Sequence, residues 1–273
     1  MNLPSNFQFS QGSLQDYVDC PRRFELRYVR QVAWPAPEKE PLAEDERRVQ
    51  QALAFHRLIQ QHGAGIAADL VSALVQDEEL ARWWRSYLQN GPALPSSRYY
   101  EAVLSAPLGG YRLLARYDLV AVEAGRRAVI VDWKTWRRRP QRSWLAGRLQ
   151  TQVYLYLLVR AGAEFNNGQP FQPEQVEMLY WFADYAVDPE RFVYDATRYR
   201  ADEARLSALI AEISQRGDDD FPMTADERAC RYCVYRSFCA RGVEAGTLDE
   251  LGDVPEAAEE IALDFEQIAE IAY

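Results

Sequence analysis

The sequence predicts an α/β fold in which a sheet core is flanked by helices. Three observations lead to this prediction. The middle of the chain is rich in β-branched and aromatic residues. The segments before and after it have the spacing of amphipathic helices. Cysteines occur near both ends, so we expect the two ends to lie together.

Composition and charge narrow the class of protein. The chain has 273 residues and is 48% hydrophobic, enough for a sizeable core. It contains no apolar run long enough to span a membrane, and its first residues do not have the pattern of a secretory signal. These features predict a cytoplasmic protein.

The charge is unevenly distributed along the chain. The net charge is −10, from 31 basic and 41 acidic residues. Residues 242–273 hold ten acids and no Lys or Arg, so residues 1–241 have a net charge of zero. We therefore expect a single domain over 1–241 followed by an acidic tail over 242–273. The overall acidity does not exclude a polyanionic partner for the domain.

The first part of the domain, about 10–90, is predicted to be helical. Residues 13–29 have helical spacing but are interrupted at Cys20-Pro21, with Pro21 opening a second helix. A Pro-rich connection over 33–41 follows. Helical patterns then cover 44–61 and about 67–88.

The sheet core is expected over about 98–185. Strands are predicted at 99–106, 111–122 and 128–133, with hairpin turns at Gly109-Gly110 and at 123–126. A helix over 143–160 and a strand over 176–182 follow. A helix over 201–214 and a cysteine loop complete the last part, 198–241, and 257–271 in the tail also has a helical pattern.

Two carboxylates and a lysine are predicted to converge in this core. Asp132 and Lys134 end an apolar strand and share one face because side chains alternate along a strand. The hairpin can place Asp118 on the neighbouring strand. Paired carboxylates suit Mg²⁺ or Mn²⁺, and an ammonium group can stabilise developing negative charge. The alternative is a surface Asp–Lys pair, a common arrangement.

Histidine is present only as His56 and His62. His56 lies on an amphipathic helical segment, where it is either a metal ligand or a core or boundary residue. As a ligand, its imidazole would shift the metal preference from Mg²⁺ towards Mn²⁺. His62, next to Gly63, is expected to be an exposed residue at the end of the helix.

The helix over 143–160 holds two Gln–Tyr pairs. Gln150 and Tyr154 are four residues apart and share one face, and so do Gln152 and Tyr156. One pair can face the acids, while the other faces solvent or the core. An ordinary amphipathic helix explains the same periodicity.

A basic and aromatic segment lies between the lysine and this helix. It contains no acid, and its arginines alternate with tryptophans. That composition suits phosphate contacts and base stacking on a single strand, although charge runs are more often solvated surface. The candidate DNA-binding residues are Arg137, Arg138, Arg139, Arg142, Trp136 and Arg148.

All four cysteines of the chain are candidate metal ligands. Cys230, Cys233 and Cys239 lie within ten residues, and Cys20 lies far upstream. This spacing is typical of a metal or cluster site in a reducing compartment rather than of a disulfide scaffold. Thiolates favour zinc or iron–sulfur clusters, and the spacing does not separate the two.

The ordered set of motifs resembles the RecB-type PD-(D/E)XK nucleases of the iron–sulfur subgroup, over about residues 8–241. Asp118, Asp132-Trp133-Lys134 and Gln150-x3-Tyr154 match the nuclease motifs in order and spacing, and His56 matches the upstream histidine. Glu101 resembles the acidic residue of the first core strand. The cysteine segments resemble the two ends of that subgroup, which includes the AddB nuclease domain and CRISPR-adaptation exonucleases.

The resemblance implies a PD-(D/E)XK restriction-endonuclease-like core with a mixed sheet and an iron–sulfur-stapled subdomain joining the two chain ends. It implies His56, Asp118, Asp132 and the Trp133 carbonyl as ligands of Mg²⁺ or Mn²⁺. Lys134, Asp132, Asp118, Gln150 and Tyr154 would serve catalysis. Cys20, Cys230, Cys233 and Cys239 would hold a 4Fe-4S cluster, with Zn²⁺ as the alternative.

The resemblance therefore predicts a metal-dependent deoxyribonuclease, an exonuclease on single strands, in DNA repair, recombination or CRISPR adaptation. Its partners would be DNA, with single strands preferred, and a helicase or a CRISPR-adaptation protein. The alternative is a non-catalytic DNA-binding or scaffold subunit of such a complex. An electron-transfer role is disfavoured because no flavin or nicotinamide fingerprint is present.

Overall fold

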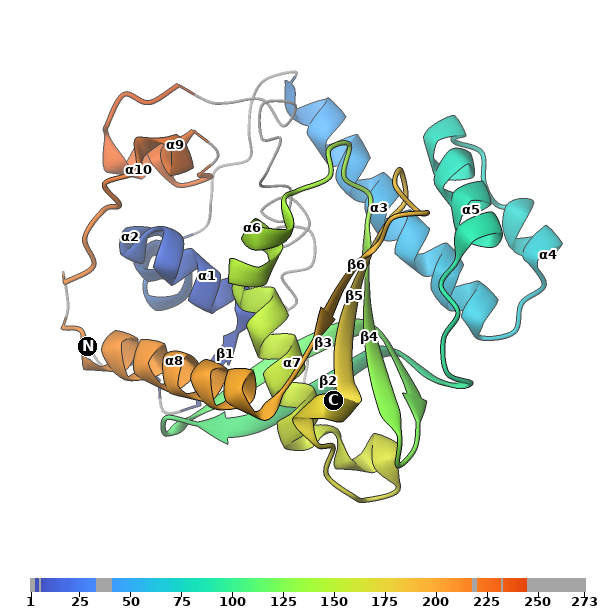
Figure 1. Cartoon of the computed structure of the whole chain (residues 1–273). Coiled ribbons are helices and arrows are strands. Elements are labelled where there is room, and N and C mark those ends of the chain that lie inside the picture. The colour runs from blue at the N-terminus through green and yellow to red at the C-terminus, as the bar shows by residue number, and fades with distance from the viewer. Residues whose placement is uncertain (1–2, 5, 33–40, 218–219, 232, 245–273) are drawn as a thin grey trace, which may run out of the picture.

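The fold is built on one mixed sheet of six strands, seen in the computed structural model of the chain (Figure 1). The structure describes residues 3–4, 6–32, 41–217, 220–231 and 233–244, except for the side chains of 41–46. The strands are β1 (Gln8–Ser10), β2 (Ser97–Leu108), β3 (Tyr111–Glu123), β4 (Arg127–Lys134), β5 (Val176–Phe182) and β6 (Glu190–Val193).

Strand β3 has two different partners along one edge. Its first part, Arg112–Leu114, pairs with β1 in parallel, and its last part, Leu119–Glu123, pairs with β4 in antiparallel fashion. Strand β2 runs antiparallel to β3 along the other edge. Beyond β4, the sheet continues with β5 in parallel and β6 in antiparallel fashion. The sheet is therefore mixed, as predicted.

Helices cover both faces of the sheet. The first core, on one face, is covered by α1 (Gln11–Asp19), α2 (Pro21–Phe24), α7 (Leu149–Ala161) and α8 (Ala196–Gln215). The second core, on the other face, is covered by α3 (Pro41–Gly63), α4 (Ala68–Ser72) and α5 (Glu78–Asn90). Figure 1 shows these two layers on opposite sides of the strands.

The remaining helices are short. They are α6 (Arg142–Gly147), α9 (Glu227–Cys230), α10 (Arg236–Cys239), the π-helical turn η1 (Glu25–Val29) and the 3₁₀ turns η2 (Gly162–Asn166) and η3 (Pro173–Gln175). Within the described residues, no helix is long and apolar enough to cross a membrane.

Local sequence signals explain most element boundaries. Ser10 caps α1 by accepting from the Ser13 amide, and Pro21 opens α2 as predicted. Gly109 and Gly110 both have positive φ in the β2–β3 turn, a conformation that favours glycine. The predicted strands at 99–106, 111–122, 128–133 and 176–182 all form.

Other predictions differ from the structure. The helical stretch over 67–88 is two helices, because the Asp77 side chain accepts the Glu79 and Leu80 amides and starts α5 anew. The stretch over 143–160 is divided between α6 and α7 at Arg148, which has an extended backbone. The predicted helix over 257–271 lies outside the described residues.

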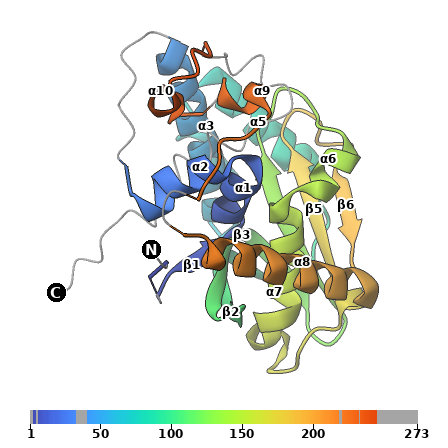
Figure 2. The same ribbon diagram turned by 90° about the vertical axis from the view of Figure 1, so that its left-hand side faces the viewer.

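The N-terminal helices α1 and α2 lie beside α8 and the segment that carries α9 and α10 (Figure 2). The Tyr17 hydroxyl on α1 donates to Glu212 on α8 at 2.6 Å. The Arg22 amide donates to the Pro222 carbonyl at 3.2 Å. Thus the segment around Cys20 is held against the segment that leads to the other cysteines.

Candidate active site

Strand β4 brings Asp132 and Lys134 to the face covered by α7. They pair in register with Tyr180 and Phe182 of β5, whose side chains belong to the first core. Lys134 Nζ lies 2.9 Å from Asp132 Oδ2, and both side chains are only 4% exposed. This burial excludes the surface-pair alternative.

Asp118 lies where β3 changes partner. It follows the segment that pairs with β1 and precedes the segment that pairs with β4. At this position β3 is paired with neither β1 nor β4. The Asp118 side chain takes the place of a backbone acceptor, because Asp118 Oδ2 accepts a hydrogen bond from the Trp133 amide at 2.8 Å. Asp118 is thereby fixed beside the peptide between Asp132 and Lys134.

Side-chain alternation inverts at this point of the sheet. Leu113, Ala115 and Tyr117 on β3 face the first core, but Leu119 faces the second. On β2, Tyr100 packs against the second core, whereas Ala102 and Leu104 belong with the first. The two inversions occur at Asp118 and Glu101, which lie opposite one another between paired neighbours.

Glu101 has the backbone geometry that causes the inversion. Its φ is +51°, a left-handed conformation that is unfavourable for a residue with a Cβ. Its side chain accepts from Arg116 Nε at 2.7 Å. Burial and the nearby Asp118 carboxylate raise the pKa of Glu101, in spite of Arg116 and His56. Glu101 therefore belongs to the same charged group as Asp118. No spacing rule could have indicated its backbone conformation.

His56 approaches the backbone of the same residue, Trp133, from α3. Its Nε2 lies 2.9 Å from the Trp133 carbonyl oxygen, and its Nδ1 lies 3.5 Å from Asp118 Oδ1. The side chains of His56 and Asp118 are 15% and 19% exposed, so this side of the site is open to solvent. Burial alone would raise the pKa of Asp118, but His56, the Trp133 amide and Lys134 together lower it.

Helix α7 supplies the opposite wall of the site. Gln150 Nε2 donates to Asp132 Oδ1 at 2.9 Å. The Tyr154 hydroxyl is buried near Asp132 and Asp118, and burial together with these charges raises its pKa well above the ordinary value. Gln152 and Tyr156 instead contact the Gly147 carbonyl and Glu203. Of the two Gln–Tyr pairs, the first faces the acids.

The donor atoms suit a divalent cation. Two carboxylates, an imidazole and a peptide carbonyl are ligands that Mg²⁺ and especially Mn²⁺ accept. In the metal-free chain these atoms bond to each other and to Lys134. Among the described residues, no three His, Cys, Asp or Glu side chains are arranged to hold a metal ion.

The basic segment after β4 differs from the predicted single-strand platform. Trp136 is 3% exposed and packs against Trp144 and Phe182, and Arg148 is 8% exposed, so neither lies on the surface. Arg139 and Arg142 both pair with Glu190, at 2.7 and 2.6 Å. The segment lies against the core because Trp136 packs against Trp144 and Phe182.

Three arginines of the segment lie on the surface. Arg137, Arg138 and Arg142 are exposed, as expected of residues that contact a phosphate backbone, and Arg142 also pairs with Glu190. The phosphate-contact prediction therefore applies to these three positions.

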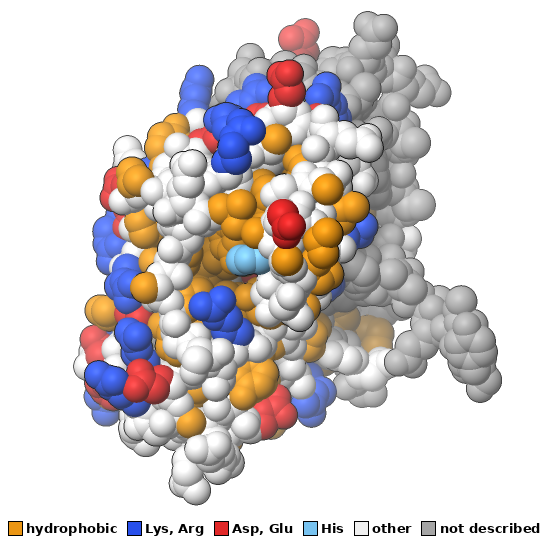
Figure 3. All heavy atoms as spheres, turned by 90° about the vertical axis from the view of Figure 1, so that its right-hand side faces the viewer, with side chains coloured by type: hydrophobic (Ala, Val, Ile, Leu, Met, Phe, Trp, Pro, Cys, Tyr) orange, Lys and Arg blue, Asp and Glu red, His pale blue; other side chains and the backbone are white. Residues whose placement is uncertain are grey.

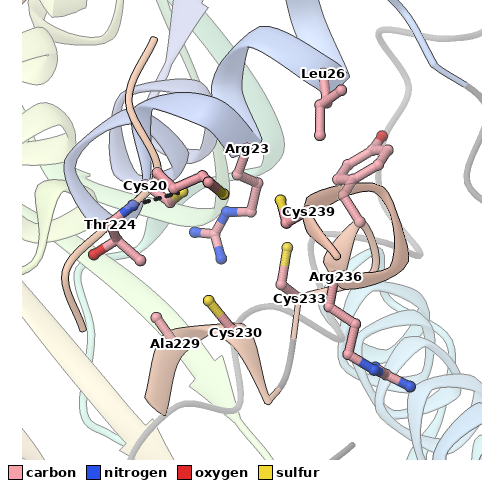
Figure 4. A pocket seen from close by; sticks show the side chains of 11 residues that line it. Cys20, Arg23, Leu26, Thr224, Ala229, Cys230, Cys233, Arg236 and Cys239 are labelled. Atoms are coloured by element: carbon pink, nitrogen blue, oxygen red, sulfur yellow. Dashed lines mark hydrogen bonds between the residues drawn. The ribbon is translucent and has the colours of Figure 1, made fainter. Parts of the chain in front are cut away.

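The four cysteines line one pocket, together with Arg23 (Figure 4). Cys20 precedes α2, and the other three come from the segment around α9 and α10. The Thr224 amide donates to Cys20 Sγ at 3.4 Å. Burial raises the pKa of the Cys233 thiol to about 11. All four carry soft sulfur atoms, a donor type that suits zinc and iron–sulfur clusters, although their side chains are not arranged around a common metal position in the described residues.

Comparisons with known proteins were made with the whole chain. The family model described as the PD-(D/E)XK nuclease superfamily matches residues 8–240. No match was found among curated proteins.

Two solved structures match most of the chain with TM-scores below 0.5. The crystal structure of SSO0001 has 15% identity, covers 86% of this chain and 87% of that chain, and has a TM-score of 0.38. The crystal structure of a "putative exonuclease" from Eubacterium rectale has 9% identity, covers 90% of this chain and 94% of that chain, and has a TM-score of 0.48.

Proposed function

The chain belongs to the PD-(D/E)XK nuclease superfamily, and from this premise we propose that it is a metal-dependent deoxyribonuclease that degrades single-stranded DNA from an end. The observation that carries the proposal is the meeting of His56, Asp118, Asp132 and Lys134 around the Trp133 peptide. We propose DNA repair, recombination or CRISPR adaptation as its context, based on the resemblance of the cysteine segments.

Each residue of the site has a proposed role. Asp118, Asp132, His56 and the Trp133 carbonyl would hold Mg²⁺ or Mn²⁺. A cation held there would supply a water of lowered pKa and would polarise the phosphoryl oxygen. Lys134 lies beside Asp132 and would stabilise the negative charge that develops on the phosphate.

The wall formed by α7 has a positioning role in this proposal. Gln150 holds one oxygen of Asp132, and the Tyr180 hydroxyl donates to Gln150 Oε1 at 3.3 Å. Tyr154 is kept neutral by the burial that raises its pKa. These groups would keep the Asp132 carboxylate in one orientation while Lys134 occupies its other oxygen.

The proposed nuclease activity is best tested with an isosteric substitution. Lys134→Ala would leave Asp132 buried without its cation, which typically costs about 3–5 kcal/mol of folding free energy. Asp132→Asn keeps the shape and the Gln150 contact but removes the charge. Because it leaves the buried Lys134 ammonium without its anion, the melting temperature of the variant is measured alongside its activity. We expect this variant to lower the rate of cleavage at least about 100-fold. The measurement is a time course on end-labelled single- and double-stranded DNA with Mn²⁺ or Mg²⁺.

A matched control uses a carboxylate outside the site. Asp202 on α8 is half-buried and accepts the Tyr194 hydroxyl at 2.8 Å. Asp202→Asn should leave cleavage unchanged. Equal cleavage by wild type and Asp132→Asn would show that the site is assigned wrongly, and no cleavage by wild type would favour the scaffold alternative.

We also propose that Cys20, Cys230, Cys233 and Cys239 hold a 4Fe-4S cluster, with Zn²⁺ as the alternative. Their convergence on one pocket from both ends of the chain supports the proposal. Metal binding would require deprotonation of the Cys233 thiol, whose pKa is raised by burial. The Arg23 guanidinium points among the cysteine side chains in Figure 4 and would offset part of the thiolate charge.

A further inference from the structure

A second pocket opens on the face of the molecule covered by α3 and α5. Figure 3 shows a hollow on this face, lined mainly by hydrophobic side chains, with a histidine and a basic side chain at its border. The pocket found there has about 200 Å³ of free space. Its main lining residues are His62, Tyr87, Gln89, Arg98, Tyr100 and Trp133.

The pocket adjoins the candidate active site through the backbone. Tyr100 precedes Glu101, Leu119 follows Asp118, and Trp133 lies between Asp132 and Lys134. Successive Cα atoms are about 3.8 Å apart, so the pocket floor and the acids share the same short stretches of strand. Because side chains alternate along a strand, Trp133 and Leu119 in the pocket face the side of the sheet opposite to Asp132 and Lys134. The second core, to which Leu119 and Trp133 belong, is also the side from which His56 on α3 approaches the acids.

Aromatic rings form the inner walls of this pocket. The Tyr87 ring lies 5.4 Å from the Trp84 ring, 5.6 Å from the Trp133 ring and 5.8 Å from the His62 ring, measured between centroids. His62 is therefore half-buried among aromatic rings, contrary to the exposed position expected from sequence. Flat walls held by such contacts suit a planar, apolar ring system.

Polar groups lie among these rings and at the rim. The Tyr87 hydroxyl forms no hydrogen bond with any described residue, and burial raises its pKa to about 12, so it remains a neutral donor. The buried atoms His62 Nδ1 and Tyr100 OH also have no hydrogen-bond partner in the described part of the chain. Gln89 and Arg98 are exposed where the pocket opens.

The charge and size of the pocket restrict its ligand. None of its lining residues is acidic and one, Arg98, is cationic, so a polyanion is not repelled. Its free space of about 200 Å³ is below the roughly 300–1,000 Å³ of pockets that hold drug-sized ligands. A single heterocyclic ring system with polar edges meets these conditions.

We propose that this pocket receives one nucleobase of the DNA strand that lies on the acids. This inference rests on the proposed nuclease function and adds a base-binding subsite to it. The base stacks among Tyr87, Tyr100 and Trp133, while Gln89 and the Tyr87 hydroxyl face its polar edges. One nucleotide is thereby held at a fixed distance from the scissile phosphate.

The test is a scan of short single strands in which each base in turn is replaced by an abasic site. Binding is measured by fluorescence anisotropy in EDTA, where cleavage does not occur. We expect one position at which loss of the base weakens binding, by roughly 5- to 150-fold, the range of base–aromatic stacking. A wild-type scan that is flat at every position overturns the proposal, whatever the variants do.

Two variants connect that position with the pocket. Tyr87→Leu keeps an apolar side chain but removes the ring, and it should abolish the sensitivity to the abasic site. Tyr87→Phe keeps the ring and removes only a hydroxyl without a hydrogen-bond partner, so it should fold normally and reduce the sensitivity. Unchanged sensitivity in both variants would overturn the proposal.

The matched control is Tyr99→Leu. Tyr99 precedes Tyr100 but its ring lies 4.4 Å from Phe165, away from the pocket. This variant should retain the wild-type scan. Cleavage of the intact strand with Mn²⁺ is measured separately. If the protein cleaves DNA but its binding is insensitive to an abasic site at every position, only the subsite is refuted. If binding is sensitive at one position but the protein does not cleave DNA, only the nuclease function is refuted.

Discussion

The buried pair of Asp132 and Lys134 explains why the site can hold charge before a metal binds. Each side chain is 4% exposed, so either charge alone would be costly in this environment. Their 2.9 Å contact and the amide of Gln150 compensate for the lost water. Under the proposed function, the pair would keep an ionised carboxylate in place for a cation.

Glu101 offers a test in which stability and activity are expected to separate. At its φ of +51°, glycine is favoured over alanine, the reverse of an ordinary strand position. We expect Glu101→Gly to be more stable than Glu101→Ala by about 1 kcal/mol in urea unfolding. Both lack the carboxylate beside Asp118, so both should cleave DNA more slowly than wild type, and to the same extent.

Two results would contradict this account. If the alanine variant were as stable as the glycine variant, the left-handed backbone would not be an energetic constraint. If both variants cleaved DNA at the wild-type rate, the Glu101 carboxylate would take no part in the reaction.

At the residue scale, the sequence predicts relations along one strand better than relations between strands. The alternation rule correctly placed Asp132 and Lys134 on one face. The same rule could not predict the inversion of side-chain direction at Glu101, because a left-handed residue interrupts the alternation that the rule assumes. The charge-rich segment around Trp136 predicts a surface position, but Trp136 is buried because it packs against Phe182, which is distant in sequence.

At the element scale, the change of partner along β3 creates the site. A strand paired along its whole length would bind the Trp133 amide through its backbone. Here β1 and β4 share one edge of β3, and the Asp118 side chain bonds that amide in the interval. A carboxylate is thus fixed at a place where the sheet has no ladder hydrogen bonds.

Short elements account for most differences between expectation and structure at this scale. The long strands and their glycine turns were predicted because each has a clear local pattern. Strands β1 and β6 have three and four residues, too few for periodicity to be recognised. Their positions depend on pairing with β3 and β5, which are distant in sequence.

The cysteine segments around α2, α9 and α10 give the second prediction. If they hold a cluster or zinc, Cys230→Ala should lose most of the bound metal. A ligand present at a thousandfold its dissociation constant raises the free energy of unfolding by about 4 kcal/mol. We therefore expect Cys230→Ala to lower the free energy of unfolding by an amount of that order. The measurements are iron, sulfide and zinc content together with the melting temperature.

The control for this prediction is Ser237→Ala. Ser237 lies on the same short helix as Cys239 but is exposed and does not line the pocket. It should keep both the metal and the melting temperature. A Cys230→Ala protein that also keeps both would refute the metal site.

At the scale of the whole molecule, charge is divided between the domain and the tail. Residues 1–241 have a net charge of zero, and the ten excess acids all lie in 242–273. If the surface arginines of the domain bind DNA as proposed, they do so in the presence of a covalently attached polyanion. We therefore hypothesise that the tail competes with DNA for the surface arginines. Because this competition is electrostatic, it should weaken as the ionic strength rises.

Removal of residues 244–273 tests this competition. The truncation takes away ten negative charges and brings the net charge from −10 to zero. We expect DNA association to become roughly tenfold faster at low salt, and the difference to vanish near 1 M salt, where charges are screened within about 3 Å. A full-length variant with the ten acids changed to Asn or Gln should behave like the truncation if charge is the cause. Unchanged affinity and activity after truncation would rule out autoinhibition by the tail, and an effect of truncation without an effect of neutralisation would rule out charge as its cause.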